Sequence, residues 1–75
     1  MLHFRYAVRT DNDWLIGVNH FYWGTFNQAK LYIRESDAKK AADRWNSRIL
    51  RYPTATGLLP ARVQKVTVGL HYGND

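Results

Sequence analysis

Hydrophobic and polar residues alternate strictly from Leu2 to Arg9. A period of two residues is typical of a β-strand with one buried face. The residues expected to face the core are Leu2, Phe4, Tyr6 and Val8, and those expected to face away are His3, Arg5, Ala7 and Arg9. Turn-forming residues occupy positions 10–13, where Asx side chains are able to bond their own backbone, and Trp14–Val18 has the composition of the returning strand of a hairpin.

The alternation returns in two later segments, which an irregular aromatic stretch at residues 19–27 separates from the hairpin. The first segment, Ala29–Arg34, is the expected third strand, and the second, from about residue 62 to residue 72, is the expected fourth strand. The residues expected to face inward are Ala29, Leu31, Ile33, Val66, Val68, Leu70 and Tyr72, and those expected to face outward are Lys30, Tyr32, Arg34, Lys65, Thr67, Gly69 and His71.

A helix is predicted from about Asp37 to Leu50, because apolar residues recur there at helical spacing. Ser36 is the expected N-cap, the charge of Asp37 suits the positive end of the helix dipole, and Pro53 with residues 54–57 ends the helix. The order β-β-β-α-β predicts an α+β fold, in which one helix packs on one face of a four-stranded antiparallel sheet, within a single domain of residues 1–75. The apolar stripe comprises Ala38, Ala41, Ala42, Trp45 and Ile49.

Charged residues are segregated between the expected elements. The chain has eleven Lys and Arg residues against six Asp and Glu residues, which gives a net charge of +5 and favours polyanionic partners. The acidic residues avoid the strands, so the outward sheet face is expected to carry positive charge. Such a face suits phosphate contact with base stacking, although Lys and Arg also simply keep the wet face of a two-layer domain soluble. The residues expected on it are Arg5, Arg9, Lys30, Tyr32, Arg34, Lys65 and His71.

The predicted helix carries a second basic line. Lys40, Arg44 and Arg48 are spaced by four residues, Arg51 falls under the same line, and no acidic residue neutralises the line by i, i+4 pairing. A line of this kind either tracks a phosphate backbone or is the solvated side of the helix.

A third candidate is the aromatic loop at residues 19–26. Its side chains either plug the open end of a small core or form a protein-binding hot spot, for which Trp23 and Tyr22 are the expected anchors.

Signals for catalysis and for cofactors are missing from the sequence. The chain has no cysteine, its three histidines lack the spacing of a metal site, and its glycines do not cluster into a phosphate loop. We therefore expect a protein that is not an enzyme and holds neither a cofactor nor a metal. The N-terminal residues do not resemble a signal peptide and no segment approaches the ~20 apolar residues of a membrane span, so a soluble, cytoplasmic protein without a membrane partner is expected.

Two resemblances follow from the element order. Three strands and a helix opened by Ser36-Asp37-Ala38, with paired alanines at Ala41 and Ala42, resemble the sheet-type DNA-binding domains of plant AP2 factors and of phage integrase N-termini. In those domains the outward residues of a three-stranded sheet enter the major groove, which would implicate Arg5, Arg9, Lys30 and Arg34. The family's glycine-rich hairpins are missing here, and the expected fourth strand departs from its pattern.

The whole order also resembles small accessory proteins of bacteriophages and prophages. The likeness rests on an N-terminal hairpin, the segment 29–33, the run Glu35-Ser36-Asp37-Ala38 before an alanine-bearing helix, and a final valine-rich strand. It implies a protein that inhibits host defence by binding, as anti-CRISPR proteins do, in the cytoplasm of a bacterial host.

Three functions are therefore weighed. The favoured one is a non-enzymatic module that binds and blocks a host protein or nucleoprotein, with Arg5, Arg9, Tyr32, Arg34 and Trp23 as anchors. The second is a sheet-type DNA- or RNA-binding domain, and the third is a purely structural homo-oligomer, such as a homodimer, built by edge-strand pairing.

Overall fold

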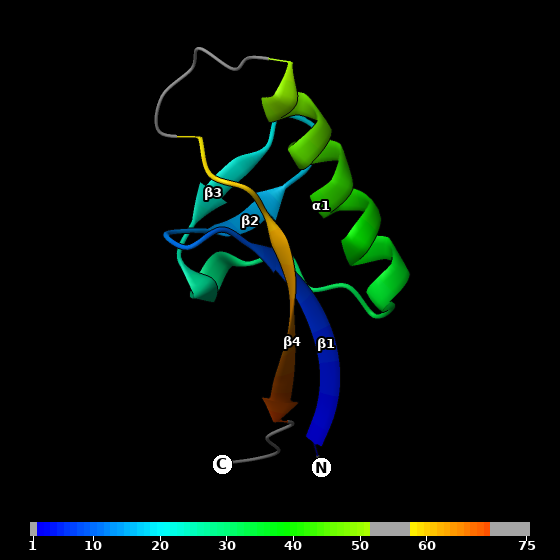
Figure 1. Ribbon diagram of the computed structural model, residues 1–75. Helices are drawn as coiled ribbons and strands as arrows, with labels where there is room; N and C mark the ends of the chain where they lie inside the picture. The colour runs from blue at the N-terminus through cyan, green and yellow to red at the C-terminus, as the bar shows by residue number, and fades with distance from the viewer. Residues whose placement is uncertain (1, 52–57, 70–75) are drawn as a thin grey trace.

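A computed structural model of the chain describes residues 2–51 and 58–69. The elements are β1 (Leu2–Arg9), β2 (Trp14–Gly17), β3 (Tyr22–Gly24), the 3-10 helix η1 (Phe26–Gln28), α1 (Glu35–Leu50) and β4 (Arg62–Gly69). The strands form one antiparallel sheet in the order β3-β2-β1-β4, and α1 lies across one face of it (Figure 1). This arrangement confirms the predicted α+β fold. The residues expected to end the helix, 53–57, and those expected to finish the last strand, 70–72, lie outside the described part of the chain.

The core lies between α1 and the sheet. Val8 and Leu15 are its largest fully buried side chains. From the helix come Trp45, which is also buried, and three alanines, whose small side chains let the helix lie close to the strands. The predicted apolar stripe is thus confirmed at Ala38, Ala41, Ala42 and Trp45, and Ile49 packs against this core while partly buried.

The helix begins two residues earlier than predicted. Arg34 occupies the N-cap position without a side-chain hydrogen bond, so Ser36 lies inside the first turn and its prediction as N-cap is wrong. Glu35 and Asp37 both lie in that turn, where negative charge interacts favourably with the amino end of the helix dipole.

The first hairpin is as expected, but a different residue orders its turn. The Thr10 N–H donates to the Asp13 carbonyl over 2.9 Å, and the Thr10 hydroxyl oxygen accepts from the N–H groups of Asn12 and Asp13, each at 3.1 Å. Thr10 is buried, so its hydroxyl rather than an Asx side chain satisfies the amides of this turn.

The third strand is not where the alternation predicted it. Tyr22–Gly24 forms β3, and the segment 29–34 contributes only a bridge in which Tyr6 and Tyr32 exchange two backbone hydrogen bonds of 2.8 and 2.7 Å. The orientation is also reversed, because Tyr32 packs against the core while Leu31 and Ile33 are exposed. A slip of one residue turns every side chain to the opposite face.

Aromatic packing explains this difference. The rings of Phe21 and Trp23 lie 5.2 and 5.0 Å from the Trp45 ring, so the segment 21–24 covers the centre of the core. Large aromatic rings bury more apolar area than the Leu31 and Ile33 side chains would.

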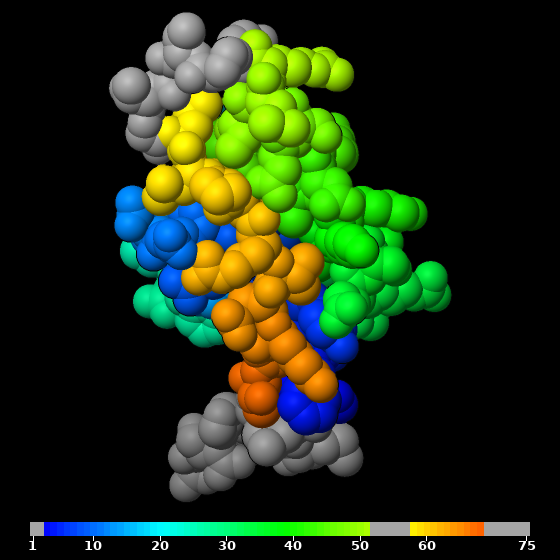
Figure 2. All heavy atoms as spheres, in the orientation of Figure 1, coloured from blue at the N-terminus to red at the C-terminus, as the bar shows by residue number. Residues whose placement is uncertain are grey.

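The free ends of β1 and β4 form a two-stranded arm. The two strands pair along their full length, from Leu2↔Gly69 to Arg9↔Arg62, whereas β2 joins β1 only at Arg9↔Trp14. The arm extends past the end of α1 and narrows toward the termini (Figures 1 and 2). Phe4, which was expected to face the core, lies on this arm and is 53% exposed because the helix does not reach it.

Candidate anion-binding surface

The predicted cationic plane on the sheet does not form. Lys65 pairs with Tyr6, and Tyr32 also pairs with Tyr6, so both lie on the sheet face that α1 covers. Arg5 and Arg9 occupy alternate positions of β1 and therefore point to the opposite face. The prediction that these residues share one face is wrong, because the register between β1 and β4 places Val66, not Lys65, opposite Arg5.

The two arginines on the helix-free face are half-buried and engaged locally. The Arg9 Nε donates to the Thr10 carbonyl over 3.0 Å, and its guanidinium lies 4.5 Å from the centroid of the Trp14 ring. The Arg5 Nη1 donates to the Phe4 carbonyl over 2.8 Å. Neither side chain reaches outward as an isolated cation, so this face is less suited to phosphate contact than the alternation implied.

Lys30 and Arg34 are exposed, but they do not join the arginines of β1. The Lys30 Nζ lies 5.5 Å from the centroid of the Tyr32 ring, and Arg34 directly precedes α1. These two predicted site residues therefore lie on the connection between the sheet and the helix.

The aromatic loop is divided between core and surface. Trp23 is partly buried and packs edge-on against Trp45, so its placement favours the structural alternative over an exposed anchor. Tyr22 is 59% exposed, with its ring 6.4 Å from that of His20.

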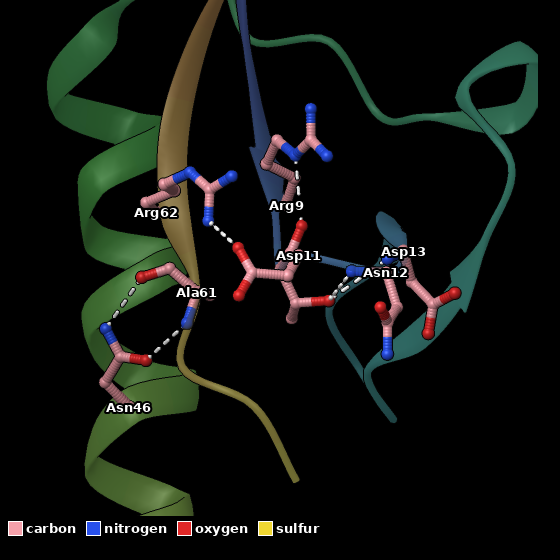
Figure 3. Close-up of polar contacts among 8 residues, drawn as sticks. Arg9, Asp11, Asn12, Asp13, Asn46, Ala61 and Arg62 are labelled. Atoms are coloured by element: carbon pink, nitrogen blue, oxygen red, sulfur yellow. Dashed lines mark hydrogen bonds and ion pairs between the residues drawn. The ribbon is translucent and has the colours of Figure 1, made fainter. Parts of the chain in front are cut away.

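The basic line on α1 is formed as expected. Lys40, Arg44 and Arg48 are exposed at intervals of one turn, and Arg51 follows at the C-cap. We call these four residues the cationic ladder. Within residues 2–51 and 58–69, the only ion pair joins Arg62 of β4 to Asp11 over 2.7 Å, and it includes no residue of the ladder (Figure 3).

The arginines of the ladder also lack acidic neighbours along the helix. Arg44, Arg48 and Arg51 have no Asp or Glu three or four positions away, whereas Lys40 has Asp37 and Asp43 at three positions on either side. Positive charge is therefore least compensated toward the carboxyl end of α1.

A shallow pocket adjoins these arginines. It has a volume of about 400 Å³ and is lined by Phe21, Asp43, Arg44, Ser47, Arg48 and Arg51. The Arg48 guanidinium lies 5.8 Å from the centroid of the Phe21 ring, close enough for cation–π attraction. Three guanidinium groups outnumber the single carboxylate of Asp43, and together with a hydroxyl and an aromatic ring they suit an anionic group that is attached to a flat or apolar moiety.

Phe21 is a site residue that the sequence did not single out. Its backbone has φ 37°, a left-handed conformation that is rare for a residue with a large side chain. Contact with Trp45 stabilises this conformation and holds the ring next to Arg48. No local pattern in the sequence indicates a positive φ at a phenylalanine.

The positive charge of the ladder residue Arg44 acts on the pKa of Tyr32. Burial raises the pKa of the Tyr32 hydroxyl above its ordinary value of 10.0, Arg44 acts in the opposite direction, and Asp37 adds to the rise. Because burial is the largest cause, Tyr32 stays neutral as a hydrogen-bonding group beside the ladder.

Among the described residues, no three His, Asp or Glu side chains gather closely enough to hold a metal ion. No described helix combines the length and apolar character that crossing a membrane requires.

Comparison of the chain with protein-family models, with curated proteins and with solved structures found no match. Its function must therefore be argued from the chemistry of its own surfaces.

Proposed function

We propose that this chain is a non-catalytic binding module that attaches to an anionic surface of a host protein or nucleoprotein and blocks that surface by occupying it. The observation that carries the proposal is the cationic ladder, above all Arg44, Arg48 and Arg51 beside the Phe21 ring. Arginine side chains bind carboxylates and phosphates with two parallel hydrogen bonds, and they are enriched at interface hot spots. An anti-defence protein of a phage, acting in the bacterial cytoplasm, is the biological role this proposal fits.

Recognition of DNA or RNA through the sheet has less support than binding through α1. The cations of the strands are divided between two faces, and Arg9 is stacked on Trp14. A ladder with one cation per helical turn contacts an extended anionic surface without help from the sheet.

The test compares two variants that lose the same charge. Replacing Arg44, Arg48 and Arg51 by Gln removes three positive charges from the ladder. The variant is incubated with bacterial lysate, and the proteins and nucleic acids that it retains are compared with those retained by the wild-type chain. We expect the wild-type chain to retain a stoichiometric partner that the ladder variant loses.

The matched control replaces Arg5, Lys30 and Arg34 by Gln, because these cations lie outside the ladder and outside both pockets beside α1. It lowers the net charge equally and should still retain the partner. Equal loss in both variants, or no stoichiometric partner for the wild-type chain, would contradict the proposal. Basic residues in the last turn also stabilise a helix by about 0.3–1 kcal/mol each, so thermal unfolding must show that the ladder variant is folded at the assay temperature.

Binding to nucleic acid alone would be recognised by its dependence on salt. For three neutralised phosphates of duplex DNA, log K should fall against log salt with a slope of about −2.7. If a random duplex binds with that slope and accounts for all the binding, the target is nucleic acid and not the proposed protein surface.

A further inference from the structure

The strand β4 forms one edge of the sheet. In the order β3-β2-β1-β4 its only strand partner within the described chain is β1. The opposite edge of β4 is therefore open over most of Arg62–Gly69, which is long for an exposed edge.

The hydrogen bonds identify which main-chain groups of β4 point to the open side. Tyr6 uses both its N–H and its carbonyl to bond Tyr32, on the side of β1 away from β4. The pair Tyr6↔Lys65 is therefore one of the pairs without mutual hydrogen bonds, so the main-chain groups of Lys65 point outward. With a period of two residues, those of Val63 and Thr67 point outward as well.

The hydrogen bonds of Ala61, which directly precedes β4, support this assignment. Its N–H donates to the Asn46 Oδ1 over 2.8 Å, and its carbonyl accepts from the Asn46 Nδ2 over 3.0 Å (Figure 3). The Asn46 amide thus pairs with the outer edge at Ala61 as a neighbouring strand would. The edge becomes open only beyond this point, which fixes where an added strand can begin.

A groove runs between this edge and α1. It has a volume of about 440 Å³ and is lined by residues of α1 and β4, among them Ala42 and Val63. Among the described residues, Lys39 and Lys65 are its unpaired cations, because the Arg62 guanidinium is paired with Asp11. Glu35 and Asp43 lie on its helix side. In Figure 2 the orange residues of β4 and the green residues of α1 border each other along this face.

We propose that β4 and this groove bind an extended, acidic peptide segment of a partner protein by β-strand addition. The peptide main chain pairs with Val63, Lys65 and Thr67, and a side chain of the peptide enters the groove. The Lys65 carbonyl accepts from the Gln64 Nε2 over 3.2 Å at the exposed edge, a contact that an added strand replaces, and outward main-chain groups at alternate residues require an extended occupant. The described β4 has no acidic residue, carries Lys65 at the open edge and belongs to a chain with a net charge of +5, so an acidic segment is favoured beside the strand, away from Glu35 and Asp43 on the helix side.

Self-pairing is less favourable. The described residues of β4 include Arg62 and Lys65 and no acidic residue, so two β4 strands side by side would bring like charges together.

The test uses a synthetic peptide of about eight residues with alternating Glu and Val, and a matched peptide with Lys in place of Glu. Binding is followed by NMR titration of the isotopically labelled protein. We expect the acidic peptide to shift the amide signals of Val63, Lys65 and Thr67 and to slow their hydrogen exchange, and the Lys peptide to have no effect. Absence of binding by the acidic peptide, or equal binding by both peptides, overturns the proposal.

Two variants of the exposed residue Thr67 distinguish the contribution of its main-chain N–H to peptide binding from that of its side chain. Thr67→Pro removes an outward N–H that β1 does not use, and edge strands tolerate proline at such positions. Thr67→Ala keeps this N–H. We expect Thr67→Pro to weaken binding of the acidic peptide by about tenfold or more and Thr67→Ala to leave it unchanged. Equal binding by the two variants would count against strand addition.

Two further measurements complete the test. If Thr67→Pro fails to fold, N-methylation of the peptide at alternate residues replaces it, and only one set of alternate positions should abolish binding. A mass in solution that doubles with concentration for the wild-type chain would make a second copy the occupant and overturn the acidic-peptide assignment. Binding of the acidic peptide should survive loss of the ladder arginines, so failure here and failure of the proposed function are distinguishable.

Discussion

The side chain of Asn46 connects α1 to the start of β4, and we predict that Asn46→Ala destabilises the fold measurably. Its amide donates to the Ala61 carbonyl over 3.0 Å and accepts from the Ala61 N–H over 2.8 Å. Ala61 is only 8% exposed, so water cannot readily replace either bond. The connection from helix to strand passes residues 52–60, and these two bonds hold its far end against the helix.

The expected magnitude follows from three contributions. Each hydrogen bond contributes about 1 kcal/mol net, and leaving a buried partner unsatisfied costs about 1–3 kcal/mol. Alanine inside a helix gains up to about 0.7 kcal/mol over asparagine, which offsets part of the loss. The free energy of unfolding should therefore fall by about 1.5 kcal/mol. For a chain of this size that lowers the Tm by about 6–12 °C.

The assay is urea and thermal unfolding followed by far-UV circular dichroism. Ser47→Ala is the control, because Ser47 is exposed on the same helix, makes none of these bonds and experiences a similar gain in helix propensity. Asn46→Asp tests the donor separately, since it keeps the shape and loses the N–H group. If Asn46→Ala unfolds within about 0.5 kcal/mol of Ser47→Ala, the proposed role of the amide is refuted.

Three further predictions concern the core, pH and a surface ion pair. Leu15→Ala should cost about 3 kcal/mol in urea unfolding because Leu15 is fully buried, whereas Leu50→Ala, at a side chain 79% exposed, should change stability by less than about 0.5 kcal/mol. Because burial raises the pKa of Tyr32 above 10.0, the stability that neutral Tyr32 contributes is complete below pH 10.0 and is lost as the pH rises through the folded-state pKa. Urea unfolding should thus show the wild-type chain losing stability more steeply than Tyr32→Phe above that pH, and parallel curves would contradict this expectation. The pair Arg62–Asp11 has side chains 53% and 75% exposed, so a double-mutant cycle with Gln and Asn should give a coupling of about 0.5 kcal/mol or less, decreasing with salt, and a value well above about 1 kcal/mol would be inconsistent with it.

The features that the sequence predicted correctly are those set by local periodicity. The alternation at Leu2–Arg9 marks β1 with the observed bounds, and the turn formers after it place β2 beside it. The alanine stripe of α1 needs no knowledge of the rest of the chain, because a helix brings residues three and four positions apart onto one face. These elements were sufficient to predict the fold class.

The features that the sequence did not predict depend on pairing between distant segments. Alternation at Ala29–Arg34 fixes which residues share a face, but not which face meets the core, and the aromatic rings of Phe21 and Trp23 decided that outcome. The same uncertainty affected β4, where Lys65 was expected beside Arg5 and pairs with Tyr6 instead. Each strand adds a choice between two orientations that its own sequence leaves open.

The contrast between local periodicity and long-range pairing explains why the sequence predicted a site on the sheet, whereas the structure supports one on the helix. A cationic plane on the sheet required several strands to share one orientation, whereas the ladder required only that one helix form. The two surfaces now proposed extend to different sides of that helix and adjoin at Asp43, which lines both pockets. Arg48 approaches Phe21 on one flank, while Lys39 and Asn46 line the groove toward β4 on the other. A partner at the ladder therefore leaves the β4 edge accessible, so one chain could engage an anionic surface and an extended segment of the same target together. Two weak contacts joined in this way bind more tightly than either alone, because the second forms at a high effective concentration. Such a gain would give a chain of 75 residues more affinity than either surface alone provides.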